Sequence, residues 1–344
     1  MAGGQGGASL LFIVGSDRPE RLTIRGSKFQ LAGSTDIYKL LGRGEPRDRL
    51  QMTPNYFRQP LRPELDGYSC LLNLITEPEQ NTKVLENLRK LFRGLPGKVV
   101  NRPEAVLRST RDQVARRLDG IAGLHVPRAV RFSAAKPEVA MRAIERAGLQ
   151  YPIILREAGT HTGKIVGCFD TADALKAALD GKGDRIATEF VDFRSEDGLY
   201  RKYRLFFFGQ RTVLRHMLTS DGWNVHAKDR RRFMLARPEL IDEERRLFED
   251  PENPFPPAVA AVFEAVRERM ELDFFGMDFG FGRDGRIVLF EANATMNFFP
   301  FLPEPELAHV LRCGPPAEGA FRELLGLPPR RRGWYESHDA PGAA

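Results

Sequence analysis

The chain has 344 residues, of which 42% are hydrophobic and 28% are charged. This composition is that of a folded globular protein, so it excludes a fibrous repeat and a wholly disordered chain, and the length predicts about two or three compact units. The net charge of +6 is compatible with acidic ligands. It permits a nucleic-acid surface without indicating one.

The three cysteines argue against a disulfide framework or a zinc site. Cys70, Cys168 and Cys313 are widely spaced and no CxxC pair occurs, so a reducing cytoplasm is the simplest compartment. No run of about 18 apolar residues is present to span a membrane. Residues 1–8 are rich in glycine and have no basic region, which predicts a flexible lead-in rather than a signal peptide.

The first part of the chain predicts an α/β domain with a parallel sheet. Residues 10–15 are a short apolar run and predict a strand, whereas residues 31–64 are rich in Gly, Pro and Arg and predict an irregular connection. The elements expected next are a buried strand over 70–75, a helix over 77–93, a strand ending at 101 and a helix over 104–118. This β-α-β order is typical of parallel sheets.

The second part predicts strands, one further helix and two hairpins. Strands are expected over residues 151–155, 164–169 and 187–193, with a loop over 159–163 and a helix over 171–179 capped by Thr171. The two hairpins are separated by a Pro- and Arg-rich stretch and a helix over 257–270. The tail from residue 328 is expected to be mobile.

The hairpin over residues 274–293 carries the strongest functional signal. Asp284 and Gly285 predict a two-residue turn, and pairing outward from that turn places Asp278 opposite Glu291. Alternation assigns one face to the core, made of Met277, Phe279, Phe281, Val288, Phe290 and Ala292. The glycines on the other face, Gly276, Gly280 and Gly282, are expected to keep it open to a bulky ligand.

The two opposed carboxylates predict a bound cation. Their Cβ atoms are expected to lie about 4.5 to 5.5 Å apart, where the charges repel. Mg²⁺ suits such a pair because it takes carboxylate and amide oxygens and usually keeps phosphates and waters as its other ligands. The alternative is a solvent-facing acidic pair on an edge hairpin.

A second hairpin, over residues 201–218, predicts an anion site. A turn at residues 209–210 places Arg204 opposite Arg215, with Lys202 and Arg211 nearby. Paired guanidiniums can hold a phosphate or a carboxylate; a solvated basic face is the alternative. The two hairpins together offer a cation site and an anion site, as phosphoryl transfer requires. No P-loop and no protein-kinase motif occurs.

From residue 71 to residue 297 the order of elements resembles the ATP-grasp superfamily, in particular its glutathione-synthetase-like and ribosomal-protein-modifying glutamate ligases. The segments that carry the resemblance are VVNRPEA at 99–105 with RDQ at 111–113, YPIILR at 151–156 with the loop GTHTG at 159–163, TEFV at 188–191, the segment from Tyr203 and Arg204 to Arg215, and GMD at 276–278 with EAN at 291–293. The last pair is the most specific.

The resemblance implies an ATP-grasp domain of α+β subdomains over residues 106–312, after an N-terminal parallel-sheet domain over 9–105. It divides the ATP-grasp domain at residue 186 into a first subdomain with a lid and a C-terminal subdomain. A C-terminal helix and mobile tail over 313–344 complete the chain. ATP is expected between the two subdomains. The oligomeric state stays open, although dimers are common among such proteins.

The resemblance also implies residue roles. Asp278, Glu291 and Asn293 are expected to hold two Mg²⁺ ions, with Mn²⁺ as the alternative ion, and Arg204 and Arg215 to stabilise the carboxylate, the acyl phosphate and the tetrahedral intermediate. The residues expected at the nucleotide are Arg156 at the phosphates; Gly159, Thr160, His161 and Gly163 in the lid; Glu189, Phe190 and Val191 in the adenine hinge; and Asp192 or Glu196 at the ribose. For His161, an ordinary loop position is an equal alternative to a contact with phosphate or substrate.

The implied activity is ADP-forming ligation of a carboxylate to an amine, or occasionally to a thiol, through an acyl phosphate. An amino acid or small peptide is the expected substrate. A ligase that forms side-chain amides or esters in a peptide or protein is one alternative. Gln113 stands where the family usually has a lysine, which leaves a nucleotide-binding module without turnover as another. His226 is interpreted as an ordinary loop residue, and a place in the acceptor pocket is the less favoured alternative.

Overall fold

The computed structural model describes residues 9–18, 22–25, 28–31, 35–42, 45–58, 63–95, 97–159, 164–179 and 181–330. The predicted lead-in, most of the predicted tail and three lid residues, Thr160, His161 and Gly163, lie outside the described residues. Within the described part of the chain, no helix is both long enough and apolar enough to cross a membrane.

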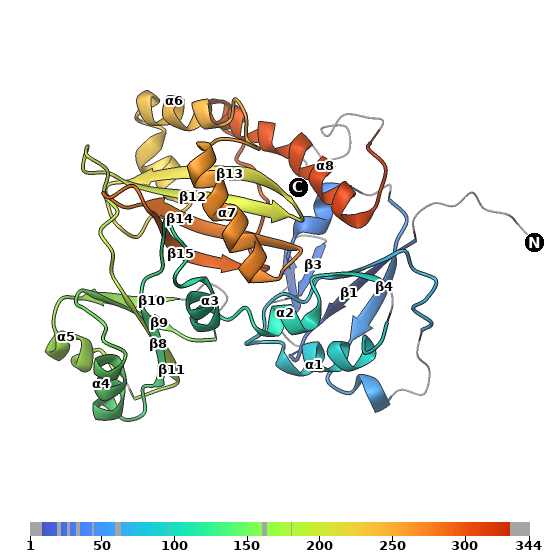
Figure 1. Ribbon diagram of the computed structural model, residues 1–344, viewed down its shortest axis with the longest axis horizontal. Helices are drawn as coiled ribbons and strands as arrows, with labels where there is room; N and C mark the ends of the chain where they lie inside the picture. The colour runs from blue at the N-terminus through green and yellow to red at the C-terminus, as the bar shows by residue number, and fades with distance from the viewer. Residues whose placement is uncertain are drawn as a thin grey trace, which may run out of the picture.

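The first sheet has four parallel strands in the order β4-β1-β5-β6, which confirms the predicted parallel sheet. Figure 1 shows β1 and β4 side by side. Its strands are β1 (Leu10–Gly15), β4 (Asp48–Met52), β5 (Cys70–Asn73) and β6 (Lys98–Val100). The prediction of an irregular connection over 31–64 was wrong at β4. This edge strand is mostly exposed and polar, so no apolar run marks it in the sequence.

Short elements join these strands. A hairpin of β2 (Leu22–Arg25) and β3 (Lys28–Leu31) and the 3-10 helices η2 (Ile37–Leu41) and η3 (Tyr56–Arg58) lie between β1 and β5. Helix α1 (Thr82–Leu91) lies between β5 and β6 in the chain.

The helix predicted over 104–118 is two helices, α2 (Pro103–Leu107) and α3 (Arg111–Leu118). They separate at Ser109, whose hydroxyl donates a hydrogen bond to the carbonyl oxygen of Val106 at 2.7 Å, and at Thr110, which has extended backbone. Such side-chain bonds to the local backbone compete with helix continuation.

The second sheet is antiparallel, in the order β10-β9-β11-β8. Its strands are β8 (Ala129–Ser133), β9 (Ile153–Glu157), β10 (Ile165–Phe169) and β11 (Asp184–Glu189), and its helices are α4 (Pro137–Arg146) and α5 (Ala172–Ala177). Thr171 caps α5 as predicted, because its hydroxyl accepts from the backbone N–H of Ala174 at 3.3 Å. β11 ends at Glu189, so residues 190–193, which were predicted to continue this strand, lie outside it.

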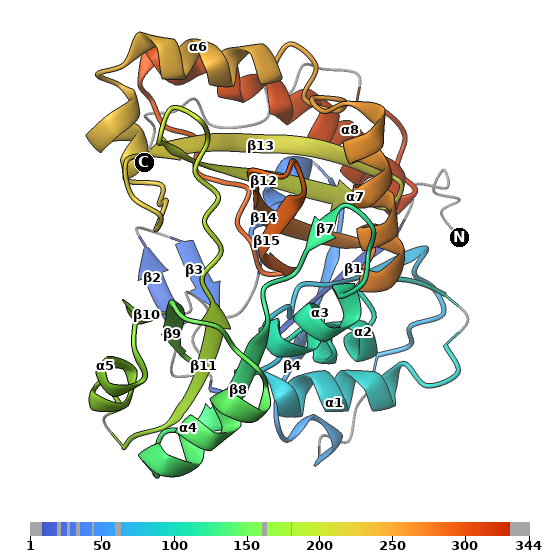
Figure 2. The same cartoon turned by 60° about the vertical axis from the view of Figure 1, so that its left-hand side comes forward.

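The third sheet has the order β13-β12-β14-β15-β7. Both predicted hairpins are present, as β12 (Tyr200–Phe208) with β13 (Arg211–Ser220) and β14 (Phe274–Phe281) with β15 (Ile287–Asn293), and β7 (Leu124–His125) joins β15 in parallel. The remaining elements are the π-helix η4 (Arg230–Met234), α6 (Pro238–Leu247), α7 (Pro257–Met270), the 3-10 helix η5 (Pro305–Cys313) and α8 (Gly314–Leu325). In Figures 1 and 2, α6 and α8 lie beside β13.

One apolar core joins the first and third sheets. Its largest buried side chains include phenylalanines of β12 and β14, namely Phe206, Phe207, Phe208, Phe274, Phe275 and Phe279. β12 and β14 have strand neighbours on both sides, so both are interior strands. The predicted site residues on these strands, Arg204 and Asp278, therefore lie on well-packed interior strands.

The second sheet has a core of its own. However, α3 and β7, which fall in the predicted first subdomain, pack on the third sheet: α3 contacts α7 and β15, and β7 pairs with β15. The division of the chain at residues 105, 186 and 312 stays a prediction.

Candidate functional site

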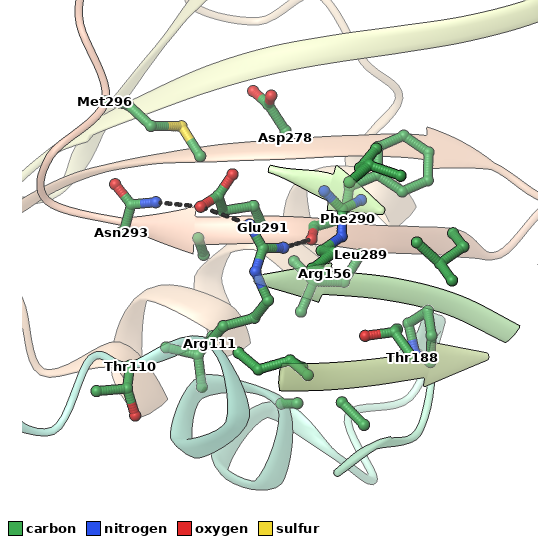
Figure 3. Close-up of a pocket in the computed structure, with 18 of the residues that line it drawn as sticks. Thr110, Arg111, Arg156, Thr188, Asp278, Leu289, Phe290, Glu291, Asn293 and Met296 are labelled. Atoms are coloured by element: carbon green, nitrogen blue, oxygen red, sulfur yellow. Dashed lines mark hydrogen bonds and ion pairs between the residues drawn. The ribbon is translucent and has the colours of Figure 1, made fainter. Parts of the chain in front are cut away.

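A cavity of about 670 Å³ lies between the second and third sheets (Figure 3). Its walls come from β9 and β11, from β12, β14 and β15, from the start of α3 and from the loop after β13. The predicted site residues that line it are Arg156, Gly159, Glu189, Phe190, Val191, Arg204, Asp278, Glu291 and Asn293. The lining does not include Asp192, Glu196 or Arg215.

The facing of Asp278 and Glu291 is confirmed, because the two residues are direct partners across β14 and β15. The predicted two-residue turn was wrong. Gly282 donates to the carbonyl of Arg286 at 2.8 Å, and Gly285 has a φ of 77°, so residues 283–285 form a three-residue turn. The pairing then shifts by one residue between Asp278 and Phe279. This bulge compensates for the longer turn.

The longer turn also changes which residues between it and the bulge face the core. Ile287 and Leu289 pack in the same core as Met277 and Phe279, whereas Val288 and Phe290 join a different apolar cluster. The predicted place of Val288 and Phe290 beside Met277 was wrong, because one extra residue reverses the alternation.

The glycines of β14 do not leave an open face. A Cβ atom at Gly276 would lie 2.8 Å from the sulfur of Met296, and one at Gly280 would lie 2.9 Å from Phe193 and Phe290. The expectation of space for a ligand there was wrong. These glycines allow neighbouring side chains to pack closely on the strand.

Asp278 is held by two cations. Arg204 donates from Nε and Nη2 to the two carboxylate oxygens at 2.6 and 2.8 Å, and the Nζ atom of Lys202 lies 3.4 Å from Oδ2. Asp278 is only 4% exposed. Burial alone would raise its pKa, but Arg204 and Lys202 outweigh burial and lower the pKa to about 2.

This pairing predicts a measurable loss of stability in acid. A carboxyl whose pKa is lowered by folding stabilises the folded chain above the unfolded-state value of 3.8, and the stabilisation is lost as the pH falls towards 2. The contribution at neutral pH is about 2 kcal/mol. In Asp278→Asn, the fall in unfolding free energy between pH 7 and pH 3, measured with urea, should be about 1 kcal/mol smaller than in the unmodified protein.

The matched control is Asp284→Asn, which changes an exposed carboxylate at the tip of the same hairpin. Its acid dependence should stay close to that of the unmodified protein. An unchanged acid dependence in Asp278→Asn would contradict the low pKa.

Glu291 is held by Arg111, at the start of α3. Nη2 of Arg111 lies 2.7 Å from Oε1 of Glu291, and Nη1 donates to the carbonyl of Phe290 at 2.7 Å (Figure 3). The Asn293 amide also donates to Oε1, at 2.9 Å. Sequence reasoning gave Arg111 no role, since a single arginine at a helix start carries no signal of what it will face.

Arg156, on β9, adds another cation to the same wall. Burial lowers its pKa and the charge of Arg111 lowers it further, while Glu291 acts in the opposite sense; the result is a pKa of about 10. Arg156 is therefore still charged at neutral pH. Around Asp278 and Glu291 the four cations Arg111, Arg156, Lys202 and Arg204 outnumber the two carboxylates, so this part of the cavity favours an anionic ligand. The other acidic side chains of the lining are Glu77, Glu79, Glu157 and Glu189.

The predicted pairing of Arg204 with Arg215 was wrong. Arg204 pairs with His216, because a bulge between Arg204 and Leu205 leaves Arg215 outside the register. Arg215 donates from Nη2 to the carbonyl of Pro300 at 2.8 Å and from Nε to that of Phe298 at 2.5 Å. Arg211 instead pairs with acidic residues away from the cavity. The catalytic role of Arg215 stays a prediction that its contacts do not support.

The predicted adenine hinge is tied down by its neighbours. The carboxylate of Glu189 accepts from the backbone N–H groups of Gln150 at 2.9 Å and Arg128 at 3.3 Å, and the N–H of Phe190 donates to Pro152 at 2.9 Å. These bonds fix where the chain leaves β11 along the cavity.

The residues predicted at the ribose and in the lid have other contacts. Asp192 pairs with Arg194 at 2.6 Å, and Glu196 does not line the cavity. The N–H of Gly159 donates to the carboxylate of Glu79 at 2.8 Å, which ties the start of the lid to the connection after β5. The ribose role stays a prediction.

The donor set fits a hard divalent cation. Among the described residues no group of three or more His, Cys, Asp or Glu side chains could hold a metal. Two facing carboxylates and the Asn293 amide are oxygen donors of the kind that Mg²⁺ takes when phosphates and waters supply the remaining ligands.

The fold is that of known ligases. No protein-family model and no curated protein matches the sequence. Among solved structures, the VanG D-Ala:D-Ser ligase of Enterococcus faecalis is similar, with a TM-score of 0.53, 13% identity, and coverage of 94% of this chain and 99% of that one. A RimK domain protein ATP-grasp from Sphaerobacter thermophilus has a TM-score of 0.50, 14% identity and coverage of 92% and 99%. A RiPP-associated ATP-grasp ligase of Chryseobacterium gregarium, in complex with ADP and a leader and core peptide, has a TM-score of 0.50, 12% identity and coverage of 95% and 99%.

Proposed function

We propose that this chain, which has the ATP-grasp fold, is an ATP-dependent, ADP-forming ligase that joins a carboxylate to an amine through an acyl phosphate. The proposed substrate is an amino acid or a small peptide. The observation that carries the proposal is the direct facing of Asp278 and Glu291 inside a cavity lined by Arg111, Arg156 and Arg204.

Both carboxylates are already neutralised by guanidinium groups. This supports an exchange of partners when the ligands bind. Arg204 covers both oxygens of Asp278, and Arg111 covers one oxygen of Glu291. We infer that Arg111 turns to phosphate oxygens, and Arg204 to the substrate carboxylate, when Asp278, Glu291 and Asn293 take up Mg²⁺. Each buried charge keeps a partner of opposite sign in this exchange, because Mg²⁺ and the negatively charged nucleotide enter the cavity together.

The chemistry needs stabilisation of negative charge. The substrate carboxylate attacks the γ-phosphorus and ADP leaves; the amine then attacks the acyl carbon and loses a proton, and inorganic phosphate leaves. Mg²⁺ would neutralise charge on the phosphate oxygens. Arg204 is placed to stabilise the carboxylate and then the tetrahedral oxyanion, and Arg156 to hold the nucleotide phosphates.

Phosphate release tests the proposal directly. We expect release from Mg-ATP with pools of amino acids or dipeptides, which supply both a carboxylate and an amine. The same pools with their amines acetylated are the control and should give no release. Calorimetry should show stronger ADP binding with Mg²⁺ than without it. Nucleotide binding with no release in any pool would instead favour a binding module without turnover.

Two observations bear on the alternatives. Gln113, the residue that suggested lost turnover, does not line the cavity, whereas Arg111 does and supplies a cation there. The similar ligase solved with a leader and core peptide favours a peptide-modifying ligase as the second candidate. The three cysteines are free, so we place the protein in the cytoplasm; a homodimer stays a prediction.

A further inference from the structure

The wall of the cavity along β12 has more positive than negative charge. Lys202 and Arg204 are two residues apart on this strand and both line the cavity, so their Cα atoms are about 6 to 7 Å apart on the same face. Asp278 pairs with both cations, but Arg204 already donates to both carboxylate oxygens of Asp278. Within the described part of the chain, Lys202 has one ion pair, the 3.4 Å contact with Asp278, although its side chain is only 17% exposed. A confined ammonium with so weak a contact attracts a further anion.

The loop after β13 brings a hydrogen-bond donor to the same cavity. Trp223 and His226 line the cavity, and Trp223 packs edge-on against Phe190 with ring centroids 5.7 Å apart. The buried carboxylate of Asp229 accepts from the backbone N–H of His226 at 2.8 Å and from Arg232 at 2.7 Å. These contacts hold the loop in one conformation beside the cavity. His226 therefore lines the cavity from an ordered loop, and its place in an acceptor pocket stays a prediction.

One contact of His226 favours one position for its proton. The backbone N–H of Lys228 lies 3.5 Å from Nδ1, which favours the neutral ring with the proton on Nε2. Burial, then the charges of Lys202 and Lys228, lower its pKa, with Asp229 acting in the opposite sense and Arg204 adding to the lowering. At neutral pH His226 is an uncharged donor through Nε2.

We propose that Lys202 and His226 form a second anion subsite, which binds the free α-carboxylate of an amino-acid or peptide substrate while a different group of the substrates reacts beside Arg204. Lys202 supplies the charge and His226 the hydrogen bond, and a carboxylate accepts both. The subsite lies on β12 and on the loop after β13, whereas Arg111 and Arg156 meet Glu291 of β15, and β14 lies between β12 and β15 in the sheet. This inference rests on the proposed ligase function and narrows its substrate class.

The test compares each amino acid with its α-amide. With saturating Mg-ATP, we expect phosphate release to favour the free carboxylate over the amide by at least about tenfold in kcat/KM, mainly through KM. Lys202→Met and His226→Leu should reduce this preference to about threefold or less, whereas Lys202→Arg and His226→Gln, which keep the cation and the N–H donor, should retain most of it. Lys228→Met is the matched control, since Lys228 is in the same loop but does not line the cavity.

Equilibrium measurements make the test independent of turnover. Amino acids should raise the melting temperature of the Mg-ADP complex more than their amides do, and His226→Leu should reduce the difference while leaving Mg-ADP affinity, measured by calorimetry, within about threefold. A preference that survives in Lys202→Met, or an absence of preference in both assays, would overturn the subsite. Loss of Mg-ADP affinity in Lys202→Met would assign Lys202 to the nucleotide instead. Absence of phosphate release with every pool would count against the ligase function, and the melting experiment would still decide the subsite.

Discussion

Substituting Glu291 by Gln should lower phosphate release at least about 100-fold while leaving the fold intact. Gln keeps the size of the side chain and a partner for the Asn293 amide, but it removes the charge that Arg111 now neutralises at 2.7 Å. Without that charge the site loses one of its two carboxylates for a divalent cation. Phosphate release under saturating Mg-ATP, with the active substrate pool, measures the effect.

The control for Glu291→Gln is a change of the same kind outside the cavity. Asp284→Asn removes a carboxylate at the tip of the same hairpin, where it pairs with exposed Arg286, and should keep activity within about twofold because exposed pairs contribute little. Binding of Mn²⁺ in the presence of ADP, followed by electron paramagnetic resonance, should weaken only in Glu291→Gln. Full activity in that variant would show that Glu291 does not hold the cation.

Substituting Arg215 by Met should lower the free energy of unfolding by about 2 kcal/mol, because the carbonyl of buried Phe298 and that of exposed Pro300 both lose their donor. Arg215 is 8% exposed, binds the carbonyls of Phe298 and Pro300, and lies 4.3 Å from the ring centroid of Phe301. The carboxylate of Asp36, from the N-terminal part of the chain, accepts from the N–H of Phe298 at 2.8 Å. Arg215 and Asp36 together fix residues 298–300, which follow Asn293 in the chain.

Urea unfolding measures this effect, and the same strand offers a control. Arg211→Met removes an arginine of β13 whose side chain is 35% exposed, and should change the free energy of unfolding by less than about 1 kcal/mol. If Arg215→Met unfolded like the unmodified protein but lost activity, the role predicted from the sequence, stabilisation of the acyl phosphate, would be supported over the positioning of residues 298–301.

The hairpins show how far local sequence determines structure. Alternation and turn residues placed Asp278 opposite Glu291, and the structure confirms the pair. They did not place Arg204, whose predicted partner Arg215 lies in a bulge. A bulge adds one residue to one strand without a distinctive residue type, so alternation cannot locate it. The pair in β14 and β15 was correct because its longer turn and its bulge compensate for each other.

The sequence by itself determined the parallel sheet, both hairpins, the pair of facing carboxylates and the resemblance to the ATP-grasp superfamily, because each of these depends on periodicity, turn residues or short motifs. Only the tertiary structure decided which cations meet those carboxylates. Arg111 reaches Glu291 from a helix 180 positions earlier in the chain, and His226 reaches the cavity through a loop held by Asp229. A long side chain on a helix start or a loop can point in many directions, and only the packing of the sheets fixes the group that it meets.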